Sequence, residues 1–214
     1  MAEPAGHDAT RRSYDSVAEN YAAQFRTELD GKPLDRALLG CLVEQAVPGA
    51  PVADLGCGPG HVTGWLADRG VAAVGIDLSP AMVAAARRDY LDAQFRAGDL
   101  LQLPAADGEF GVAVMFYAII HLAPGELTRA FAETRRVLRP GGHALVSFHL
   151  GDEVRHLDQW MGHEVDVSFR FFALRDVTSA MADAGLQVTA QLERTSYPGE
   201  VATRRGYLLA QRPA

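Results

Sequence analysis

The sequence has few of the residues that hold small secreted proteins together or anchor a chain in a membrane. Only two cysteines, Cys41 and Cys57, occur in 214 residues, so at most one disulfide could form. The longest apolar run, Val112–Ile120, has about half the length of a membrane-spanning helix. Residues Met1–Ser13 are polar and lack the apolar stretch of a secretory signal. We therefore expect a cytoplasmic protein with reduced thiols and no membrane partner.

Positive charge is also scarce. The 20 basic residues are outnumbered by 27 acidic ones, which gives a net charge of -7, and Lys32 is the only lysine. The arginines are scattered singly or in short pairs such as Arg87-Arg88, with no basic stripe that could neutralise a row of phosphates. This excludes nucleic acid as an expected partner. The abundance of alanine beside a single lysine is typical of a bacterial, GC-rich genome.

Composition and length indicate one globular domain. Hydrophobic residues make up 48% and charged residues 22% of the chain, which is ordinary for a folded protein. A chain of this size buries enough surface to fold without disulfides or a structural metal. The stretch Val47-Pro48-Gly49-Ala50-Pro51 marks a break between an N-terminal helical segment, residues 1–50, and a core, residues 51–212.

Two helices are predicted before this break. In the first, Ser13 or Asp15 is the candidate N-cap, and five apolar or aromatic residues recur at three- and four-residue spacing: Tyr14, Val17, Ala18, Tyr21 and Phe25. The second helix covers 34–46, after Pro33.

After the break, short apolar runs alternate with helical patterns, which is typical of a parallel sheet with helices on both faces. The predicted strands are 52–55, 73–76, 94–97, 112–116, 143–148, 187–194 and 206–211, and the last two pair antiparallel. The predicted helices are 61–69, 80–89, 124–137 and 173–184, and a turn covers 139–142. The expected fold class is α/β: a Rossmann-like, seven-stranded mixed sheet with helices on both faces and an N-terminal helical lid. Residues 149–172 form an insertion.

A glycine-rich turn joins the first predicted strand to its helix. Glycines there let the backbone approach a ligand, and the following helix offers free N–H groups. A dinucleotide loop has a glycine where this chain has His61, and a phosphate loop needs Gly-Lys-Ser/Thr, which is absent. A diphosphate is therefore disfavoured. Asp77 follows about 20 residues later, where an acidic side chain accepts hydrogen bonds from ribose hydroxyls.

Four motifs in order resemble class I S-adenosylmethionine-dependent methyltransferases. They are Asp54-x-Gly56-x-Gly58-x-Gly60, Asp77 after Val74-Gly75-Ile76, Gly98-Asp99-Leu100, and Arg139-Pro140-Gly141-Gly142. The similarity spans about residues 50–212. One position departs from the family pattern, because Gly111 stands where the fourth strand often begins with aspartate. The N-terminal stretch, residues 117–121 and the histidine-rich insertion together resemble small bacterial natural-product methyltransferases.

The resemblance implies S-adenosylmethionine as cofactor. It implies that Asp54 and the glycine loop hold the methionine part and that Asp77 binds the ribose. Ser79 or Met82 would pack near the adenine, whose amino group donates to Asp99 while the Leu100 backbone contacts a ring nitrogen. The cofactor-binding set is Asp54, Gly56, Gly58, Gly60, Asp77, Leu78, Ser79, Met82, Gly98, Asp99, Leu100, Phe116 and Tyr21. The alternative is that Asp54 and Asp77 are helix caps and Asp99 a turn residue.

The segment after the fourth strand, Phe116–Leu122, points to the acceptor. Adenine-targeting nucleic-acid methyltransferases have Asn or Asp, Pro-Pro and an aromatic residue here, and this chain does not, which favours a small-molecule acceptor. His121 is the candidate general base, because the pKa of histidine lies near neutral pH. Tyr117 would orient the acceptor. The alternative for both residues is a packing role.

The remaining candidates come from the first helix and the insertion. Tyr14, Tyr21 and Phe25 share one helix face, and in the resemblance such tyrosines belong to a lid over the transferring methyl group. In the insertion, Trp160 is a candidate apolar wall and His149 or His156 a polar handle. The spacing of His149, His156, Asp158 and His163 fits no metal motif, so no metal is expected. Four residues are expected to be an exposed charge cluster, with the rim of the site as the alternative: Arg194, Tyr197, Glu200 and Arg204.

The predicted catalytic residues are His121, Tyr117 and Tyr21, and the predicted substrate-binding residues are Tyr14, Tyr21, Phe25, Tyr117, His121, His149 and Trp160. The expected reaction is methyl transfer to O, N or C of an aromatic or heterocyclic secondary metabolite, including indole-type compounds, by a monomer or homodimer. The alternatives are a non-catalytic S-adenosylmethionine-binding sensor or partner subunit and, least favoured, a nicotinamide-dependent oxidoreductase.

Overall fold

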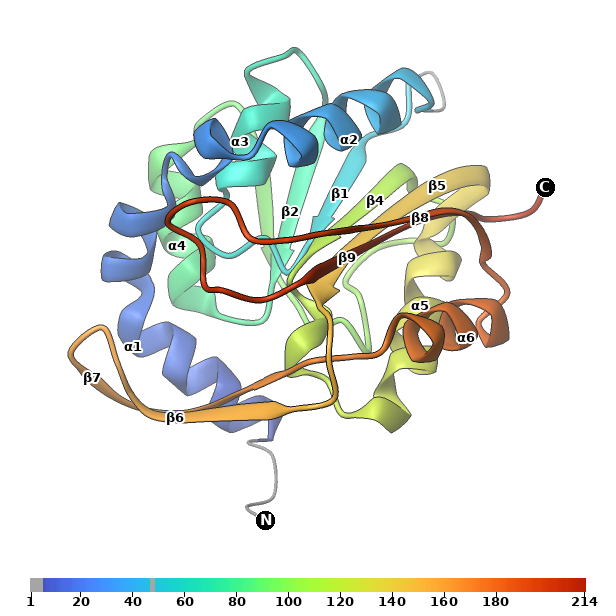
Figure 1. Ribbon diagram of the computed structural model, residues 1–214. Coiled ribbons are helices and arrows are strands. Elements are labelled where there is room, and N and C mark those ends of the chain that lie inside the picture. The colour runs from blue at the N-terminus through green and yellow to red at the C-terminus, as the bar shows by residue number, and fades with distance from the viewer. Residues whose placement is uncertain (1–5, 47–48) are drawn as a thin grey trace.

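A seven-stranded sheet forms the centre of the protein, of which the computed structural model describes residues 6–46 and 49–214 (Figure 1). The strand order is β3-β2-β1-β4-β5-β9-β8. The five strands β3, β2, β1, β4 and β5 run parallel, and β9 and β8 are antiparallel, so the predicted mixed sheet is confirmed. The bounds are β1 Val52–Leu55, β2 Ala73–Asp77, β3 Gln94–Ala97, β4 Phe110–Phe116, β5 Leu138–His149, β8 Gln187–Arg194 and β9 Arg205–Gln211.

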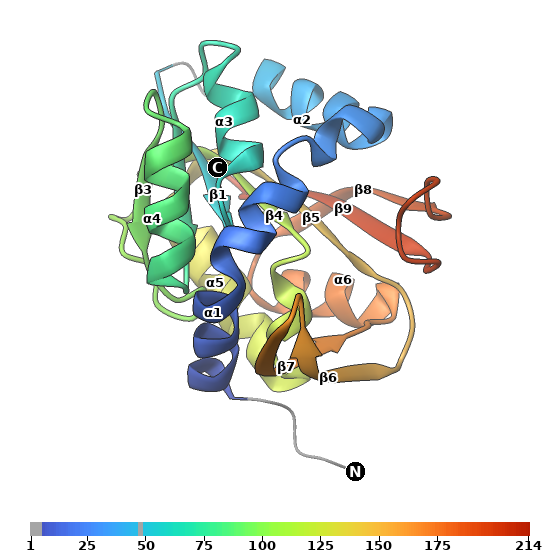
Figure 2. The same cartoon turned by 90° about the vertical axis from the view of Figure 1, so that its left-hand side faces the viewer.

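Helices cover both faces of this sheet, because successive strand residues point to opposite sides. In β2, Val74 and Ile76 pack in the core beneath α5 and α6, whereas Ala73 packs with the opposite helices. Figure 2 shows α2 and α3 on one side of the strands and α5 and α6 on the other. The helices are α2 Pro33–Glu44, α3 His61–Ala67, α4 Pro80–Asp89, α5 Leu127–Val137 and α6 Leu174–Asp183.

The N-terminal helix α1, His7–Phe25, begins earlier than predicted, and the expected N-caps were wrong. The Ser13 hydroxyl donates to the Ala9 carbonyl and accepts from the Asp166 backbone N–H at 2.8 Å. Asp15 accepts from the Ser79 hydroxyl at 2.6 Å and from the Ala81 N–H at 3.2 Å. These two residues therefore fasten α1 to a hairpin strand and to the start of α4, which explains why they resemble caps in the sequence.

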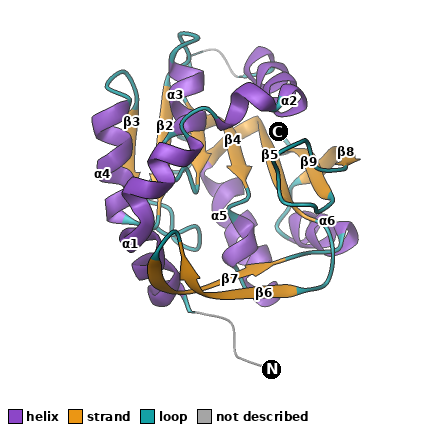
Figure 3. Cartoon of the chain, turned by 60° about the vertical axis from the view of Figure 1, so that its left-hand side comes forward, coloured by secondary structure: helices purple, strands orange, loops and turns teal. Residues whose placement is uncertain are grey.

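A separate two-stranded sheet, β6 Val154–Trp160 and β7 His163–Arg170, occupies the insertion, for which no regular structure was predicted. Its turn consists of Met161 and Gly162, both with positive φ, which matches the right-handed twist of the strands. Figures 1 and 3 show the hairpin beside α1, and Ser13 and Asp166 form the hydrogen bond between them.

The other differences concern element ends. α3 ends at Ala67 because the chain turns at Gly70, and α5 is preceded by a 3-10 turn, Pro124–Glu126. β5 begins at Leu138, so it includes the predicted turn 139–142, whose residues form an irregularity between the pairs Phe110–Leu138 and Val112–His143. Residues 47 and 48 of the predicted break lie outside the described residues. No helix in the described part of the chain is long and apolar enough to cross a membrane.

Gly60 fixes the turn between β1 and α3, and its replacement tests how tightly this turn is packed. Its φ is +87°, and a Cβ there would lie 2.8 Å from the Phe95 ring and 2.9 Å from Ala86. Gly70, with φ +74°, is the matched control, because a Cβ there would meet nothing within 4 Å. We expect Gly70→Ala to lower the free energy of unfolding by about 1 kcal/mol. We expect Gly60→Ala to lower it by a further ~1–3 kcal/mol through overpacking. Urea unfolding measures both, and equal losses would contradict this packing.

Candidate active site

A cavity of about 790 Å³ lies along the edge of the sheet where the parallel strands end. Its floor includes Gly56 after β1, Asp77 at the end of β2 and Tyr117 after β4. Residues of α1 and of the β6–β7 hairpin cover it, and the 195–204 loop between β8 and β9 contributes its far end. The carboxyl ends of parallel strands are where ligands bind in open α/β sheets.

The glycine loop and Asp77 form one end of the cavity. The Asp77 carboxylate accepts hydrogen bonds from the backbone N–H groups of Gly58 at 2.7 Å and Ser79 at 2.8 Å. Desolvation raises the pKa of Asp77 to about 6, and the two hydrogen bonds only partly offset this. At Gly56, a Cβ would lie 2.4 Å from the Ala118 Cβ, so the loop passes close to the cavity floor. This end offers a hydrogen-bond acceptor and open backbone to a ligand that carries hydroxyl groups.

Most of the predicted cofactor residues line the cavity: Gly56, Gly58, Asp77, Leu78, Ser79, Gly98, Asp99, Leu100, Phe116 and Tyr21. Three others, Asp54, Gly60 and Met82, are not among its lining residues. The buried Asp54 carboxylate accepts from the Thr63 hydroxyl at 2.6 Å, and Met82 packs against Val17 and Ala18. These residues support the loop and α4 from behind.

Asp99 is paired with His7, the first residue of α1, which sequence reasoning missed. The His7 ring nitrogens lie 3.1 Å from an Asp99 carboxylate oxygen and 3.3 Å from Glu126. Burial lowers the pKa of His7, but the hydrogen bonds and charges of these two acids outweigh that effect and raise it. His7 therefore ties the start of α1 to the cavity wall.

Aromatic side chains from α1 and the hairpin meet in the lining of the cavity and form an aromatic cluster. The Trp160 ring lies edge-on to both Tyr14 and Tyr21, with ring centroids 5.5 Å apart in each case. Phe25 lies 4.2 Å from Tyr21, and Phe169 lies 5.6 Å from Trp160. The structure thus brings together four residues that were predicted to bind the substrate. It adds Phe169, which was not predicted from the sequence although β7 alternates apolar and polar residues.

His121 lines the cavity, but both of its ring nitrogens are engaged. Nδ1 lies 2.9 Å from the Ser168 carbonyl, which can only accept, so Nδ1 carries the hydrogen. Nε2 is then free to accept from the Tyr14 hydroxyl at 2.8 Å. Burial lowers the pKa of His121 to about 4, so the ring is neutral near pH 7. This geometry orients the Tyr14 hydroxyl, and a role for His121 as general base stays a prediction.

His149 and Tyr117 lie toward the other end of the cavity. The His149 ring stacks on Phe171 at 5.0 Å and lies 5.0 Å from Tyr117, and its Nδ1 is 2.8 Å from the Thr203 hydroxyl. Of the two predicted polar handles, His149 lines the cavity and His156 does not. Across residues 6–46 and 49–214, no three His, Cys, Asp or Glu side chains are grouped as metal ligands.

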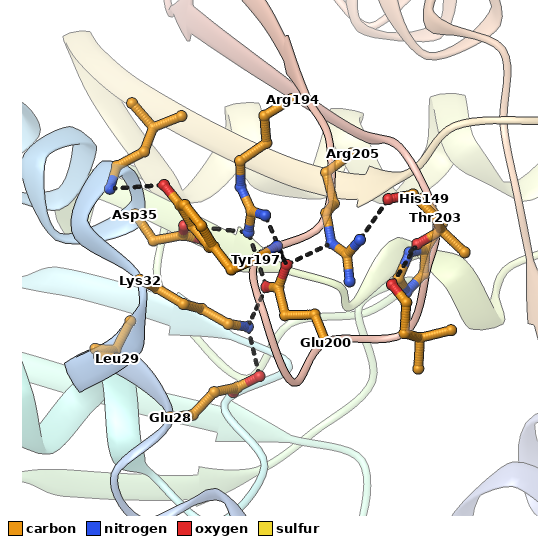
Figure 4. Close-up of polar contacts among 12 residues, drawn as sticks. Glu28, Leu29, Lys32, Asp35, His149, Arg194, Tyr197, Glu200, Thr203 and Arg205 are labelled. Carbon is orange, nitrogen blue, oxygen red and sulfur yellow. Dashed lines mark hydrogen bonds and ion pairs between the residues drawn. The ribbon is translucent and has the colours of Figure 1, made fainter.

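The far end of the cavity carries a charged cluster, of which the sequence indicated only Arg194 and Glu200 (Figure 4). It comprises Glu28, Lys32, Asp35, Arg194, Glu200 and Arg205. The favoured expectation of exposure was wrong for Arg194 and Glu200, whose side chains are only 9% and 11% exposed, whereas Arg204 is 66% exposed. Glu200 lines the cavity, in agreement with the alternative of a site rim. The chain's only lysine, Lys32, is 8% exposed here. Lysine almost never lies inside a protein without a partner, so the burial of Lys32 depends on the acids around it.

Ion pairs hold this cluster together. Lys32 Nζ lies 2.5 Å from Glu28, which also contacts His61 at 3.0 Å. Burial raises the pKa of Glu28, but His61 and Lys32 outweigh that effect and lower it to about 2. Arg194 donates to both carboxylate oxygens of Glu200, at 2.6 and 2.9 Å. Glu200 also contacts Lys32, the N-cap of α2, so the 195–204 loop is fixed to the start of this helix.

Comparison with known proteins places these features in a family. Residues 52–142 match the family described as "Methyltransferase domain". The chain is 39% identical over 102 residues to a demethylmenaquinone methyltransferase of Beutenbergia cavernae, covering 48% of this chain and 42% of that protein. It is 27% identical over 192 residues to a malonyl-[acyl-carrier protein] O-methyltransferase of Serratia marcescens, covering 89% of this chain and 72% of that protein. The chain thus spans less than half the length of the first of these relatives.

A solved structure agrees with this assignment. The Burkholderia thailandensis 1,6-didemethyltoxoflavin-N1-methyltransferase, with bound 1,6-didemethyltoxoflavin and S-adenosylhomocysteine, superposes with a TM-score of 0.74 at 19% identity, covering 100% of this chain and 93% of that one. At this identity the match concerns the fold. Residues 52–142 therefore carry a methyltransferase domain, and the chain as a whole has the fold of this structure.

Proposed function

We propose that this protein transfers a methyl group from S-adenosylmethionine to an aromatic or heterocyclic small molecule. The observation that carries the proposal is one cavity that is lined both by Asp77 and the glycine loop and by aromatic side chains of α1 and the hairpin. Asp77 suits ribose hydroxyls, because it is an enclosed carboxylate without a cationic partner among the described residues. The aromatic cluster suits a flat acceptor.

S-adenosylmethionine supplies an activated methyl group on a sulfonium. The chain's own residues then have to align the acceptor and exclude water. Tyr21 and Trp160 cover the cavity from α1 and the hairpin, and Ser13 and Asp15 keep α1 in place. His121 holds the Tyr14 hydroxyl toward its own Nε2, which fixes the phenol ring beside Trp160.

Calorimetric titration with S-adenosylhomocysteine, followed by an assay of its release from S-adenosylmethionine with a set of aromatic acceptors, tests the proposal. We expect saturable binding and acceptor-dependent release. Binding without release for any acceptor would instead support the alternative, a non-catalytic sensor or partner subunit. Absence of binding would contradict both.

The pKa of Asp77 predicts how cofactor affinity changes with pH. Ribose hydroxyls donate to the ionised carboxylate, so S-adenosylhomocysteine should bind with constant affinity above about pH 6 and more weakly as the pH falls through that value. Calorimetry from about pH 5 to about pH 8 measures this. Asp77→Asn should bind at least ~10-fold more weakly and lose the step. The Asp77→Asn variant retains His7. If its affinity still falls as the pH is lowered, a group other than Asp77 causes the pH dependence.

Two substitutions separate positioning by His121 from general-base catalysis. His121→Gln can keep both hydrogen bonds, since its amide N–H can donate to Ser168 and its oxygen can accept from Tyr14. His121→Leu keeps neither. If His121 positions Tyr14, the Gln variant should retain most of kcat and the Leu variant should lose about ten-fold or more. If His121 is the base, both variants should lose about a hundred-fold or more. Steady-state kinetics on the first acceptor found distinguishes these outcomes.

A further inference from the structure

We propose that the acceptor carries a carboxylate, which binds at the far end of the cavity between Arg205, Lys32 and His149. The inference rests on the proposed function, because it assigns this end of the cavity to the acceptor. It adds a chemical group that neither the domain match nor the motifs specify.

Arg205 is a buried cation with few partners. It begins β9 and pairs with His149 of β5, so it lies at the same sheet edge as the other cavity residues. The residue is 3% exposed. Its Nη1 donates to the Thr203 carbonyl, but within the described ranges no acceptor forms a hydrogen bond with Nε. A buried guanidinium has five N–H donors, and leaving them unpaired is costly, which favours a ligand that accepts from them.

The acids of the charged cluster are shared unevenly among its cations, and Arg205 has the smallest share. Its one acidic partner among the described residues, Glu200, lies 3.4 Å from Nε and is already bound by Arg194 and by the Tyr197 N–H at 2.7 Å. Lys32 is 3.3 Å from the same carboxylate (Figure 4). Lys32 has a second acid in Glu28, and Arg194 has one in Asp35. Among the described residues, Arg205 is thus the cation of this cluster that shares its single acid and keeps an unbonded N–H. A ligand carboxylate would satisfy that donor.

The cations near Arg205 also affect the pKa of His149. Burial is the largest cause that lowers its pKa to about 4, and Arg205, Arg155 and Lys32 lower it further, against only one opposing acid, Glu200. The ring is therefore neutral near pH 7 and adds no positive charge of its own. It can serve as a flat surface beside the carboxylate, stacked on Phe171.

The order of the strands predicts how a bound acceptor would be oriented in the cavity. Asp77 ends β2, Tyr117 follows β4, His149 ends β5 and Arg205 begins β9, and these strands lie in the order β2-β1-β4-β5-β9. An acceptor with its carboxylate at Arg205 would place its ring beside Tyr117 and the aromatic cluster, toward the glycine loop. A carboxylate suits Arg205 because the guanidinium fork can bind both of its oxygens.

Matched pairs of ligands test the carboxylate directly. We would measure, by calorimetry or ligand-observed NMR, the binding of indole-3-acetate against indole-3-acetamide and of 1-naphthoate against 1-naphthamide to protein saturated with S-adenosylhomocysteine. Each pair shares its ring and differs in charge. We expect the acids to bind at least ~10-fold more tightly than the amides. Equal binding, tighter binding of the amides, or no binding of either acid would overturn the proposal.

Three variants locate the effect. Arg205→Gln should remove the preference for the acid, whereas Arg204→Gln, the adjacent exposed arginine paired with Glu193, should keep it. Glu200→Gln removes the competing negative charge and should tighten binding of the acid. A preference that survives in Arg205→Gln, or weaker acid binding in Glu200→Gln, would contradict the site. Should Arg205→Gln not fold, Arg205→Lys keeps the charge without the fork and should retain only part of the preference.

Binding of S-adenosylhomocysteine gives an independent readout. It should be unchanged in all these variants, because the charged cluster lies away from Asp77 across the sheet edge. If the wild-type protein does not bind it, the proposed function fails. In that case the binding of acid and amide is compared in the absence of S-adenosylhomocysteine, and this comparison still tests whether the cavity binds a carboxylate.

Discussion

The direction of five parallel strands is the constraint on which the cavity depends. Because β3, β2, β1, β4 and β5 run the same way, their carboxyl ends open at one edge. Asp77, the glycine loop, Tyr117 and His149 all follow from that direction. The antiparallel β9 starts where its neighbour β5 ends, so it adds Arg205 to the same edge. The strand directions thus place the proposed cofactor end and the proposed acceptor end along one edge of the sheet.

The cover over this edge depends on a few polar contacts of α1. Ser13 binds the β7 backbone, Asp15 binds the start of α4, and His7 bridges Asp99 and Glu126. The apolar face of the helix packs through Val17 and Ala18 against Met82. Hydrophobic packing alone leaves a helix free to slide, whereas these three contacts fix where Tyr14 and Tyr21 lie above the cavity.

The sequence predicts local periodicity well and long-range partners poorly. The bounds of β1, β3, α4 and β8 agree with prediction. β1 is a short, fully buried run, and α4 begins at the cap Ser79 followed by Pro80. The β6–β7 hairpin was missed although Val165, Val167 and Phe169 alternate, because Met161-Gly162 is not a familiar turn pair. The burial of Arg194 and Glu200 arises from partners such as Lys32 and Asp35 more than 150 residues away, which no local pattern contains.

The central claim is that one row of residues along the sheet edge binds cofactor and acceptor side by side. A crystal structure of the protein with S-adenosylhomocysteine and indole-3-acetate tests it most directly. The account predicts the ribose at Asp77, the indole ring beside Tyr117 and the aromatic cluster, and the carboxylate within hydrogen-bond distance of Arg205. S-adenosylhomocysteine bound away from Asp77, or a carboxylate that points into solvent with Arg205 unpaired, would contradict it.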